Sequence, residues 1–426
     1  MNNIELGRMQ HAIALTLEPP FQRLGTEGVG GASLTVRTQH EGLNEKGIPT
    51  TLIGPAPKRG EIISKYPVGF YDLQEMLDRV RKGEDAFDTS SDTLWEVYAD
   101  ERVAEQIRQI IPSGEGILGA HFYTTQGLLN HGWQTEKKLV YFHHSPFTRV
   151  RNLYDPRAVL DHETTKASRI RTDAEASLLQ KSDAVVFFTE AEADLTRQQY
   201  PEFPLDNLRV VPLGIDTKKF NPARKAEIRQ ELRETHGIPQ DATVLYMQAR
   251  IGASQGQLLL TELYANYLMD NPNLHLAIVG DAARGEDDYY SQIKEYANRF
   301  PGRITLTGSL KPEEGHSLGD IGVGFKLETW GYSNLEVMAM GNPLITQDNL
   351  IHREVYGGNG GVFYIDINRL NESGYSDATF DELSRKLKDK DWQRYAKTHN
   401  PLKVRGLTWQ RSTESLIETM KDVVSR

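Results

Sequence analysis

The stretch that decides the fold is Glu328-Thr-Trp-Gly-Tyr-Ser-Asn-Leu-Glu-Val-Met-Ala-Met-Gly-Asn342. It follows the short apolar segment 320–327, which is bounded by glycines and predicts a buried strand of a parallel sheet. Ser333 stands three residues before Glu336 and just ahead of an apolar run, a pattern that predicts a capping box opening a helix. The unit is therefore a strand, an acidic turn and a helix.

The start of this helix is predicted to bind an anion. In an open α/β sheet, ligands bind beyond the carboxyl ends of the strands, where helix N-termini offer unpaired N–H groups and a positive dipole end. Gly331 would let the chain pass close to a ligand, because it has no Cβ atom. The backbone amides expected to face a phosphate are those of Tyr332, Ser333 and Asn334.

Two carboxylates flank this predicted anion site. Glu328 and Glu336 would repel a phosphate, so they are expected to contact neutral hydroxyl groups on either side of it. For Glu336 an alternative is open, because a Glu at the third position of a capping box commonly contacts only the backbone N–H of the cap.

The arrangement of these residues resembles a family motif. A Glu, an aromatic residue followed by Gly, and a second Glu eight positions after the first are similar to the pattern of retaining nucleotide-sugar glycosyltransferases of the GT-B type, family 4. The resemblance implies that Glu328 holds hydroxyls of the transferred sugar and that Glu336 holds the ribose. It also implies a GT-B architecture, in which two Rossmann-like, doubly wound α/β domains face each other across a cleft.

Composition is that of an ordinary globular protein. The chain has 426 residues, 38% of them hydrophobic and 25% charged, which suits two domains better than one core. No run approaches the roughly 20 apolar residues of a membrane span, and the N-terminus lacks the pattern of a signal peptide, so a cytoplasmic location is expected. The absence of cysteine excludes disulfides and thiolate metal sites. A net charge of −10 argues against nucleic acid and membrane surfaces as partners.

The chain opens with the pattern of a Rossmann-like domain. Segments 11–17 and 48–53 predict strands, and 32–46 predicts a helix between them. The loop Gly25-Thr-Glu-Gly-Val-Gly-Gly31 would bring backbone amides at Gly30 and Gly31 close to a phosphate, although a plain tight turn is an equal alternative. In the family that this chain resembles, such a loop lies against the donor phosphates or the acceptor.

Two further strands end in polar residues, while segment 60–114 predicts helix. Segment 117–123 ends in Ala-His-Phe-Tyr123, and segment 138–142 is followed by His143-His144-Ser145. The resemblance implies a catalytic histidine beside the transferred sugar at His144, and Tyr123 is expected near the acceptor. A structural, hydrogen-bonded histidine is the stronger alternative, and a metal site the weaker one.

A basic stretch at 148–171 stands out in this acidic chain. Charges on a helix are usually solvated. However, Arg171 followed by Glu175 resembles a segment near the acceptor in members that are similar to sucrose-phosphate synthase. Arg149 and Arg171 are therefore expected to bind the acceptor, and arginines favour a phosphorylated one.

A hinge phrase marks the domain boundary. Gly214-Ile-Asp216 and then Phe220-Asn-Pro222 resemble the family's entry into its second domain. We predict an acceptor domain at 1–211 and a donor domain at 212–400. A C-terminal helix led by Trp409, within 401–426, is expected to pack back on the first domain.

The second domain is predicted to bind the donor. Strands are expected at 182–189 in the first domain and at 242–247, 274–279, 304–307, 343–346 and 362–365 in the second. The resemblance implies that Arg250 neutralises the donor pyrophosphate and that Gly308 to Lys311, Leu310 included, reads the nucleobase. Family members carry a lysine where this chain has Gln255, which can donate a hydrogen bond but has no charge. Either another basic residue substitutes for it or the activity is altered.

These patterns together predict a hexosyltransferase. It would move a sugar from a nucleoside-diphosphate sugar to a small hydroxyl acceptor, such as a sugar phosphate, with no cofactor and no metal; the acidic run at 286–288 is discounted as a metal motif. A GT-B epimerase, a phosphorylase and a non-catalytic nucleotide-sugar binder remain alternatives, and Gln255 favours the binder. The base, the sugar, the acceptor and homo-oligomer formation stay open.

Overall fold

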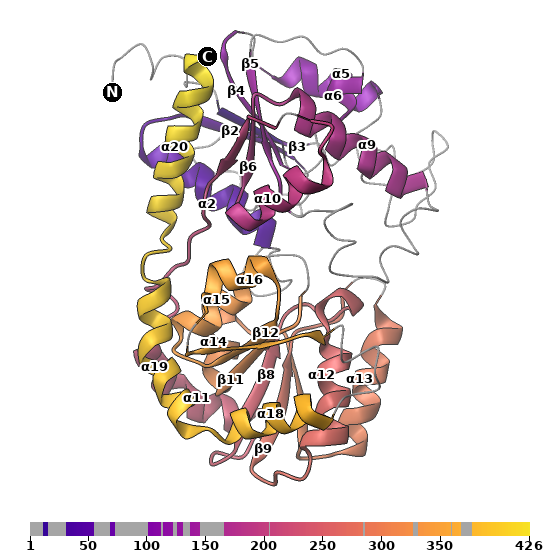
Figure 1. Cartoon of the computed structure of the whole chain (residues 1–426), viewed down its shortest axis with the longest axis vertical. Helices are drawn as coiled ribbons and strands as arrows, with labels where there is room; N and C mark the ends of the chain where they lie inside the picture. Colours follow the sequence, from indigo (N-terminus) through magenta and orange to yellow (C-terminus); the bar gives the residue numbers. More distant parts are fainter. Residues whose placement is uncertain are drawn as a thin grey trace. The chain divides into compact units, whose positions relative to one another are not determined.

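The protein folds into two compact units in the computed structural model (Figure 1). Unit 1 holds the described residues up to Gly214 together with Trp409–Arg426, and unit 2 holds Ile215–Thr408. The residues that the structure describes are 12–15, 31–54, 69–72, 101–111, 114–121, 126–130, 137–144, 166–203, 205–283, 286–326, 331–358, 360–367 and 377–426. The divisions at 214/215 and 408/409 compare with predicted boundaries at 211/212 and 400/401.

Unit 1 is built on a parallel sheet with the order β3-β2-β1-β4-β5-β6-β7 among its described strands. Its strands are β1 Ala12–Leu15, β2 Thr50–Gly54, β3 Gly69–Asp72, β4 Gly116–His121, β5 Lys137–Phe142, β6 Ala184–Phe187 and β7 Leu208–Val210. Its helices are α2 Gly31–Glu45, α5 Glu101–Ile110, α6 Gln126–Asn130, α9 Lys166–Lys181, α10 Glu190–Gln199 and α20 Trp409–Ser425.

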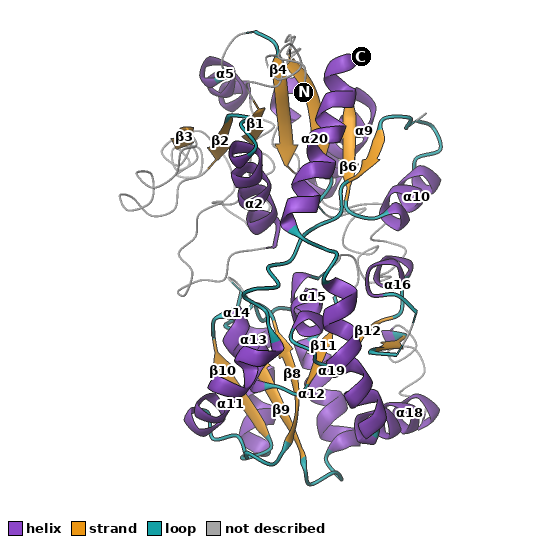
Figure 2. Ribbon diagram, turned by 90° about the vertical axis from the view of Figure 1, so that its left-hand side faces the viewer, coloured by secondary structure: helices purple, strands orange, loops and turns teal. Residues whose placement is uncertain are grey.

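Side-chain alternation along the central strands of unit 1 builds a core on each face. Leu139 and Tyr141 of β5 pack toward α5, α6, α9 and α10, whereas Val140 and Phe142 pack toward α2 and α20. The helix α20 presents buried side chains from Leu416 to Val423 to this second core, and α2 and α20 lie side by side (Figure 2). The C-terminal helix thus belongs to unit 1.

Unit 2 repeats the design with the order β10-β9-β8-β11-β12-β13, again all parallel. Its strands are β8 Thr243–Gln248, β9 Leu274–Val279, β10 Ile304–Gly308, β11 Ile321–Gly324, β12 Leu344–Gln347 and β13 Val362–Ile365. Its helices are α11 Pro222–Thr235, η2 Ala253–Gln255, α12 Gln257–Leu263, η3 Tyr264–Leu268, α13 Asp287–Arg299, α14 Pro312–Leu318, α15 Tyr332–Ala339, α16 Leu350–Tyr356, α18 Asp377–Lys388 and α19 Lys390–Val404.

Both sheets show the strand order of doubly wound nucleotide-binding folds, which confirms the predicted fold class. The order reverses between β1 and β4 in unit 1 and between β8 and β11 in unit 2. At such a reversal, neighbouring crossovers run to opposite faces and leave a crevice beyond the carboxyl ends of the two strands. The reversal between β8 and β11 therefore predicts where unit 2 binds a ligand.

One element departs from the sequence prediction. Segment 60–114 was expected to be helical, but Gly69–Asp72 forms the edge strand β3, paired with β2. Four residues are too few for a period to show, and the pairing partner lies 18 residues away, with Thr51 opposite Gly69. Tertiary pairing decides this strand.

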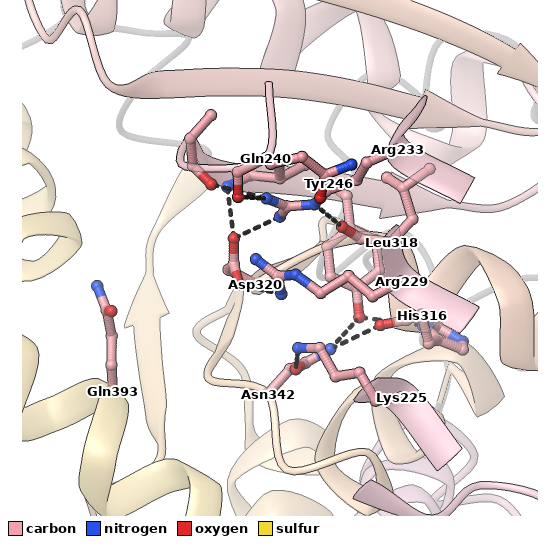
Figure 3. Close-up of polar contacts among 12 residues, drawn as sticks. Lys225, Arg229, Arg233, Gln240, Tyr246, His316, Leu318, Asp320, Asn342 and Gln393 are labelled. Carbon is pink, nitrogen blue, oxygen red and sulfur yellow. Dashed lines mark hydrogen bonds and ion pairs between the residues drawn. The ribbon is translucent and has the colours of Figure 1, made fainter. Parts of the chain in front are cut away.

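A charged cluster joins the amino ends of β8 and β11 (Figure 3). Asp320 accepts hydrogen bonds from Arg229 (2.5 Å), Arg233 (2.7 Å) and the backbone N–H of Val244 (2.8 Å). Burial alone would raise the pKa of Asp320, but the Arg229 hydrogen bond and the nearby positive charges outweigh it and lower the pKa from 3.8 to about 2. This carboxylate thus ties α11 to the two central strands.

We predict that Asp320→Asn destabilises the protein at neutral pH by roughly 3 kcal/mol, because it leaves the charges of Arg229 and Arg233 uncompensated. Since the folded-state pKa is depressed, the stabilisation is present above about pH 3.8 and is lost as the pH falls through about 2. The difference in the free energy of unfolding between wild type and variant should therefore shrink as the pH falls from about 3.8 to about 2. Denaturant unfolding at several pH values measures it.

The matched control is Asp348→Asn, which removes an exposed ion pair with Arg353. Its expected cost is at most about 1 kcal/mol. Equal costs for the two variants at neutral pH would contradict the role given to Asp320.

Candidate active site

The loops that follow β8, β9 and β10 are joined by backbone hydrogen bonds at the carboxyl edge of the unit 2 sheet. The N–H of Gly280 donates to the carbonyl of Gly308 (2.9 Å), and the N–H of Ile251 donates to the carbonyl of Asp281 (2.8 Å). Gly280 has a φ of 144°, and Gly308 has a φ of 71°. These bonds fix a continuous edge beside the reversal point.

The helix α15 starts at this edge without the predicted capping box. Its N-cap is Gly331, with a φ of 54° and no side-chain capping bond, so the helix begins at Tyr332 and includes Ser333. The Ser333 hydroxyl instead donates to the carbonyl of Gln248 (2.8 Å), which ends β8. The capping-box prediction is wrong because the Ser333 hydroxyl joins α15 to the end of β8 and does not cap its own helix.

Glu336 is likewise not a capping residue. Its Oε2 lies 2.8 Å from Nε2 of His316, a residue of α14, and its side chain is 12% exposed. The alternative in which Glu336 only satisfies the cap is therefore excluded. The carboxylate is held by His316 and stays partly exposed.

The amide groups of this turn are only partly available to a ligand. The N–H of Asn334 donates to the carbonyl of Gly331 (2.9 Å), so it is already used. The Asn334 side chain is buried and donates to Thr346 Oγ1 (3.2 Å). Asn334 thus supports the turn from inside, and the contact expected between an anion and the amides of Tyr332 and Ser333 stays a prediction.

The predicted donor residues after β8 and β10 lie at the same edge. Arg250 is exposed, and its carbonyl accepts a hydrogen bond from Gln257 (2.8 Å), so the loop that carries the arginine is fixed. Gln255 lies in η2 and donates to Ser254 Oγ (3.3 Å). The carbonyl of Gly308 accepts from the N–H of Gly280 and from the Thr307 hydroxyl, and Leu310 is half-buried, so the nucleobase contact expected at Gly308 and Leu310 stays a prediction.

In unit 1 the structure gathers histidines at the carboxyl ends of β4 and β5. His121 Nδ1 lies 2.7 Å from His144 Nε2, and the ring of His40 from α2 meets the His121 ring edge-on. Burial, with a smaller effect of His143, lowers the pKa of His144 to about 3, and burial lowers the pKa of His40 to about 3. These imidazoles are therefore neutral at physiological pH and can act as hydrogen-bonding groups.

The neighbouring His143 pairs with a buried glutamate instead. His143 Nε2 lies 2.7 Å from Glu175 Oε1, and the Tyr200 hydroxyl donates to Glu175 Oε2 (2.5 Å). Glu175 is only 2% exposed. Glu175 is thus held inside unit 1 by these two partners, and the acceptor role expected for the Arg171–Glu175 segment stays a prediction.

Several predicted residues cannot be placed. Gly31 is the first residue of α2, and Arg171 lies on α9, with side-chain positions there outside the description. The residues that lie outside the described ranges are Glu328, Gly30, Tyr123 and Arg149. Their roles stay predictions.

In the part of the chain that the structure describes, no three His, Asp or Glu side chains are grouped so as to hold a metal ion. Every helix there is too short or too polar to cross a lipid bilayer.

Sequence reasoning missed the partners that hold the site. His316 and Tyr246 lie in α14 and β8, and neither belongs to a recognisable motif. His121 could have been found, because it stands at the carboxyl end of a predicted strand next to the one that ends before His144. No such signal exists for the pairing of His316 with Glu336, which are 20 residues apart.

Comparison with known proteins assigns both halves of the chain. The family model described as Glycosyltransferase Family 4 matches residues 29–219, and the model described as Glycosyl transferases group 1 matches residues 228–398. A D-inositol 3-phosphate glycosyltransferase of Actinosynnema mirum is 24% identical over 326 residues, which are 72% of each chain.

Solved structures share the whole fold. Sucrose-phosphate synthase from Thermosynechococcus elongatus superposes with a TM-score of 0.78 at 17% identity and covers 98% of this chain and 99% of its own. HepE of Anabaena, in complex with UDP and glucose, gives a TM-score of 0.69 at 14% identity, with 97% and 100% covered.

The two family matches and the two parallel sheets define a glycosyltransferase. The chain belongs to the glycosyltransferases of family 4, and its two doubly wound units form the GT-B fold. The family resemblance found in the sequence is thereby confirmed.

We predict that Gly280→Ala disrupts the carboxyl edge of unit 2, because the added Cβ would lie 2.0 Å from the carbonyl oxygen of Ala249. The expected loss of stability is roughly 3 kcal/mol or more, from this clash added to the strained φ. Gly302→Ala is the matched control, since Gly302 also has a positive φ but has nothing within 4 Å. It should cost about 1 kcal/mol. Thermal unfolding compares the two, and similar losses would contradict the packing described.

Proposed function

We propose that this protein is a retaining hexosyltransferase that uses a nucleoside-diphosphate sugar as donor and a small phosphorylated hydroxyl compound as acceptor. The observation that carries the proposal is the Ser333–Gln248 bridge. It places the start of α15 and the carboxylate of Glu336 at the reversal point of the unit 2 sheet. A helix start there offers N–H groups to a diphosphate, and a carboxylate beside it accepts from sugar hydroxyls.

Structural neighbours support a nucleotide donor. The solved structures of HepE contain UDP with glucose or UDP-glucose, and HepE shares the two-domain fold of this chain. In unit 2 we assign the diphosphate to the amides of Tyr332 and Ser333 together with Arg250, and the ribose to Glu336. The base would contact backbone groups near Leu310, so the side chains do not select among UDP, GDP and ADP.

The names of two similar proteins and two arginines of unit 1 support a phosphorylated acceptor. The Actinosynnema mirum relative is named for D-inositol 3-phosphate, and the structural neighbour is named sucrose-phosphate synthase, so each name contains a phosphorylated polyhydroxy compound. Unit 1 carries arginines at Arg149 and Arg171, and guanidinium groups suit phosphate. We propose that these two bind the acceptor phosphate and that His144 contacts the transferred sugar.

The chemistry requires stabilisation of a departing diphosphate. As the glycosidic C–O bond breaks, the sugar becomes oxocarbenium-like and negative charge grows on the leaving phosphate. Arg250 and the amide-rich start of α15 would stabilise that charge, with help from the Gly30–Gly31 loop. We propose that the leaving phosphate itself takes the proton of the attacking hydroxyl on the same face, which retains the configuration.

Gln255 leaves this site one cation short of the family pattern, and Lys326 is our candidate to replace it. Lys326 follows β11 by two residues and is half-buried. Its neighbour Phe325 packs so close to η2 that a Cβ on Gly256 would lie 2.9 Å from the Phe325 Cβ. The backbone that carries Lys326 therefore passes beside the turn that follows Gln255, and none of the ion pairs between described residues involves Lys326.

We predict that Lys326→Met lowers the turnover number about a hundredfold, the usual effect of removing one group that stabilises developing charge. Adding Gln255→Lys to that variant should restore most of the rate, because the cation returns at the family position. Lys294→Met on α13 is the control and should leave the rate unchanged. Unchanged turnover in Lys326→Met would contradict this assignment.

The activity itself is tested by donor titration followed by product detection. Wild-type protein is titrated with UDP-, GDP- and ADP-glucose by calorimetry, and each mixture is then incubated with glucose 6-phosphate, fructose 6-phosphate or inositol 3-phosphate. Transfer of the hexosyl group with release of the nucleoside diphosphate is expected. Conversion without an acceptor would indicate an epimerase, consumption of a glycoside with phosphate a phosphorylase, and binding without turnover a nucleotide-sugar binder.

A further inference from the structure

A hydrogen-bond network of side chains runs through unit 2 to Glu336. Lys225 Nζ lies 2.5 Å from Asn342 Oδ1, Asn342 Nδ2 lies 2.9 Å from the Tyr246 hydroxyl, and that hydroxyl lies 3.1 Å from His316 Nδ1 (Figure 3). His316 Nε2 then lies 2.8 Å from Glu336 Oε2. Four secondary-structure elements contribute to this network, namely α11, β8, α14 and α15, and Asn342 lies between α15 and β12.

The direction of the hydrogen bonds can be worked out from Asn342. Its Nδ2 donates to the backbone carbonyl of His316 (3.0 Å), which can only accept, so the same Nδ2 points to Tyr246. The amide oxygen of Asn342 therefore faces Lys225 and accepts from Nζ, although burial lowers the pKa of this lysine to about 7. The backbone carbonyl of His316 thus fixes the amide orientation of Asn342.

The tautomer of His316 follows from this orientation. The Tyr246 oxygen accepts from Asn342, so its own proton is free to donate to His316 Nδ1. Burial raises the pKa of Tyr246 well above its ordinary value, so that proton is retained. An acceptor at Nδ1 puts the ring hydrogen on Nε2, which donates to Glu336 Oε2. Each group in the network therefore donates to the next one in the direction of the Glu336 carboxylate.

The network engages Oε2 of Glu336 and does not include Oε1. His316 is fully buried, whereas the Glu336 side chain keeps 12% exposure, and the bonds of its carboxylate within the described residues use Oε2. A carboxylate oxygen has two lone pairs, so Oε1 can accept from neighbouring hydroxyls. Because His316 comes from α14, the carboxylate cannot turn without breaking this partly buried bond between two helices.

We propose that His316 is a positioning residue for the donor ribose: it locks the Glu336 carboxylate so that Oε1 accepts from ribose hydroxyls, and Tyr246 and Asn342 fix the tautomer that this requires. This inference rests on the proposed function, since it needs a nucleotide at Glu336. It also gives the buried polar groups between α11 and α15 a purpose beyond packing.

The test measures discrimination between ribose and its deoxygenated form. The probe is whichever of UDP, GDP and ADP raises the melting temperature of the wild type most, used beside its 2′,3′-dideoxy counterpart. Wild type should bind the ribonucleotide about tenfold more tightly, because the dideoxy form leaves the carboxylate without its partners. His316→Leu should lose this preference while its affinity for the dideoxy form stays within about twofold.

Two further variants separate positioning from folding. His316→Gln can still present an N–H to Glu336 and should retain most of the preference. Tyr246→Phe keeps the ring but removes the hydroxyl that donates to His316 Nδ1, so His316 is no longer held in the tautomer with its hydrogen on Nε2. The preference for the ribonucleotide should therefore fall. This nearly isosteric variant provides the test if His316→Leu does not fold. In a Glu336→Gln background, His316→Leu should cause no further loss.

The outcomes distinguish a failure of the proposed function from a failure of the positioning role of His316. Wild type that binds none of the nucleotides overturns the proposed function. Wild type that prefers the ribonucleotide, with His316→Leu weakening both probes equally or neither, overturns the positioning role alone.

Discussion

The pairing of β8 with β11 is the constraint on which unit 2 depends. At the amino ends of these strands, Asp320 joins both to α11 through two arginines. At the carboxyl ends, the Ser333 hydroxyl bonds to the carbonyl of Gln248. Because strand order reverses between β8 and β11, the second bond holds a helix start at the place where doubly wound sheets bind ligands. Fold and site are therefore fixed by the same pair of strands.

The two units differ in the electrostatics of their carboxyl edges. Unit 2 offers an exposed arginine, Arg250, with helix amides close to the sheet, an arrangement suited to anions. Unit 1 offers His121 and His144, whose pKa values burial lowers so that both rings are neutral. Neutral imidazoles can donate and accept hydrogen bonds without repelling or attracting a phosphate. This division matches a charged donor on one unit and sugar hydroxyls on the other.

The order of strands and helices was largely predictable from the sequence, since hydrophobic period and glycine punctuation are local. The start of α15 was predicted within two residues, but its cap was not, because the Ser333 hydroxyl donates to the carbonyl at the end of β8. The bond between His316 and Glu336 depends on how α14 packs beside α15, which no local pattern encodes. The burial of Glu175 has the same origin, because its partners His143 and Tyr200 are the residues that directly follow β5 and α10.

The most direct measurement of the central claim is a crystal structure of the protein with its preferred nucleoside diphosphate. The account predicts the diphosphate within hydrogen-bond distance of the Tyr332 and Ser333 amides and of Arg250, with a ribose hydroxyl on Glu336 Oε1. A nucleotide bound elsewhere on the chain, or a ribose that does not contact Glu336, would contradict it.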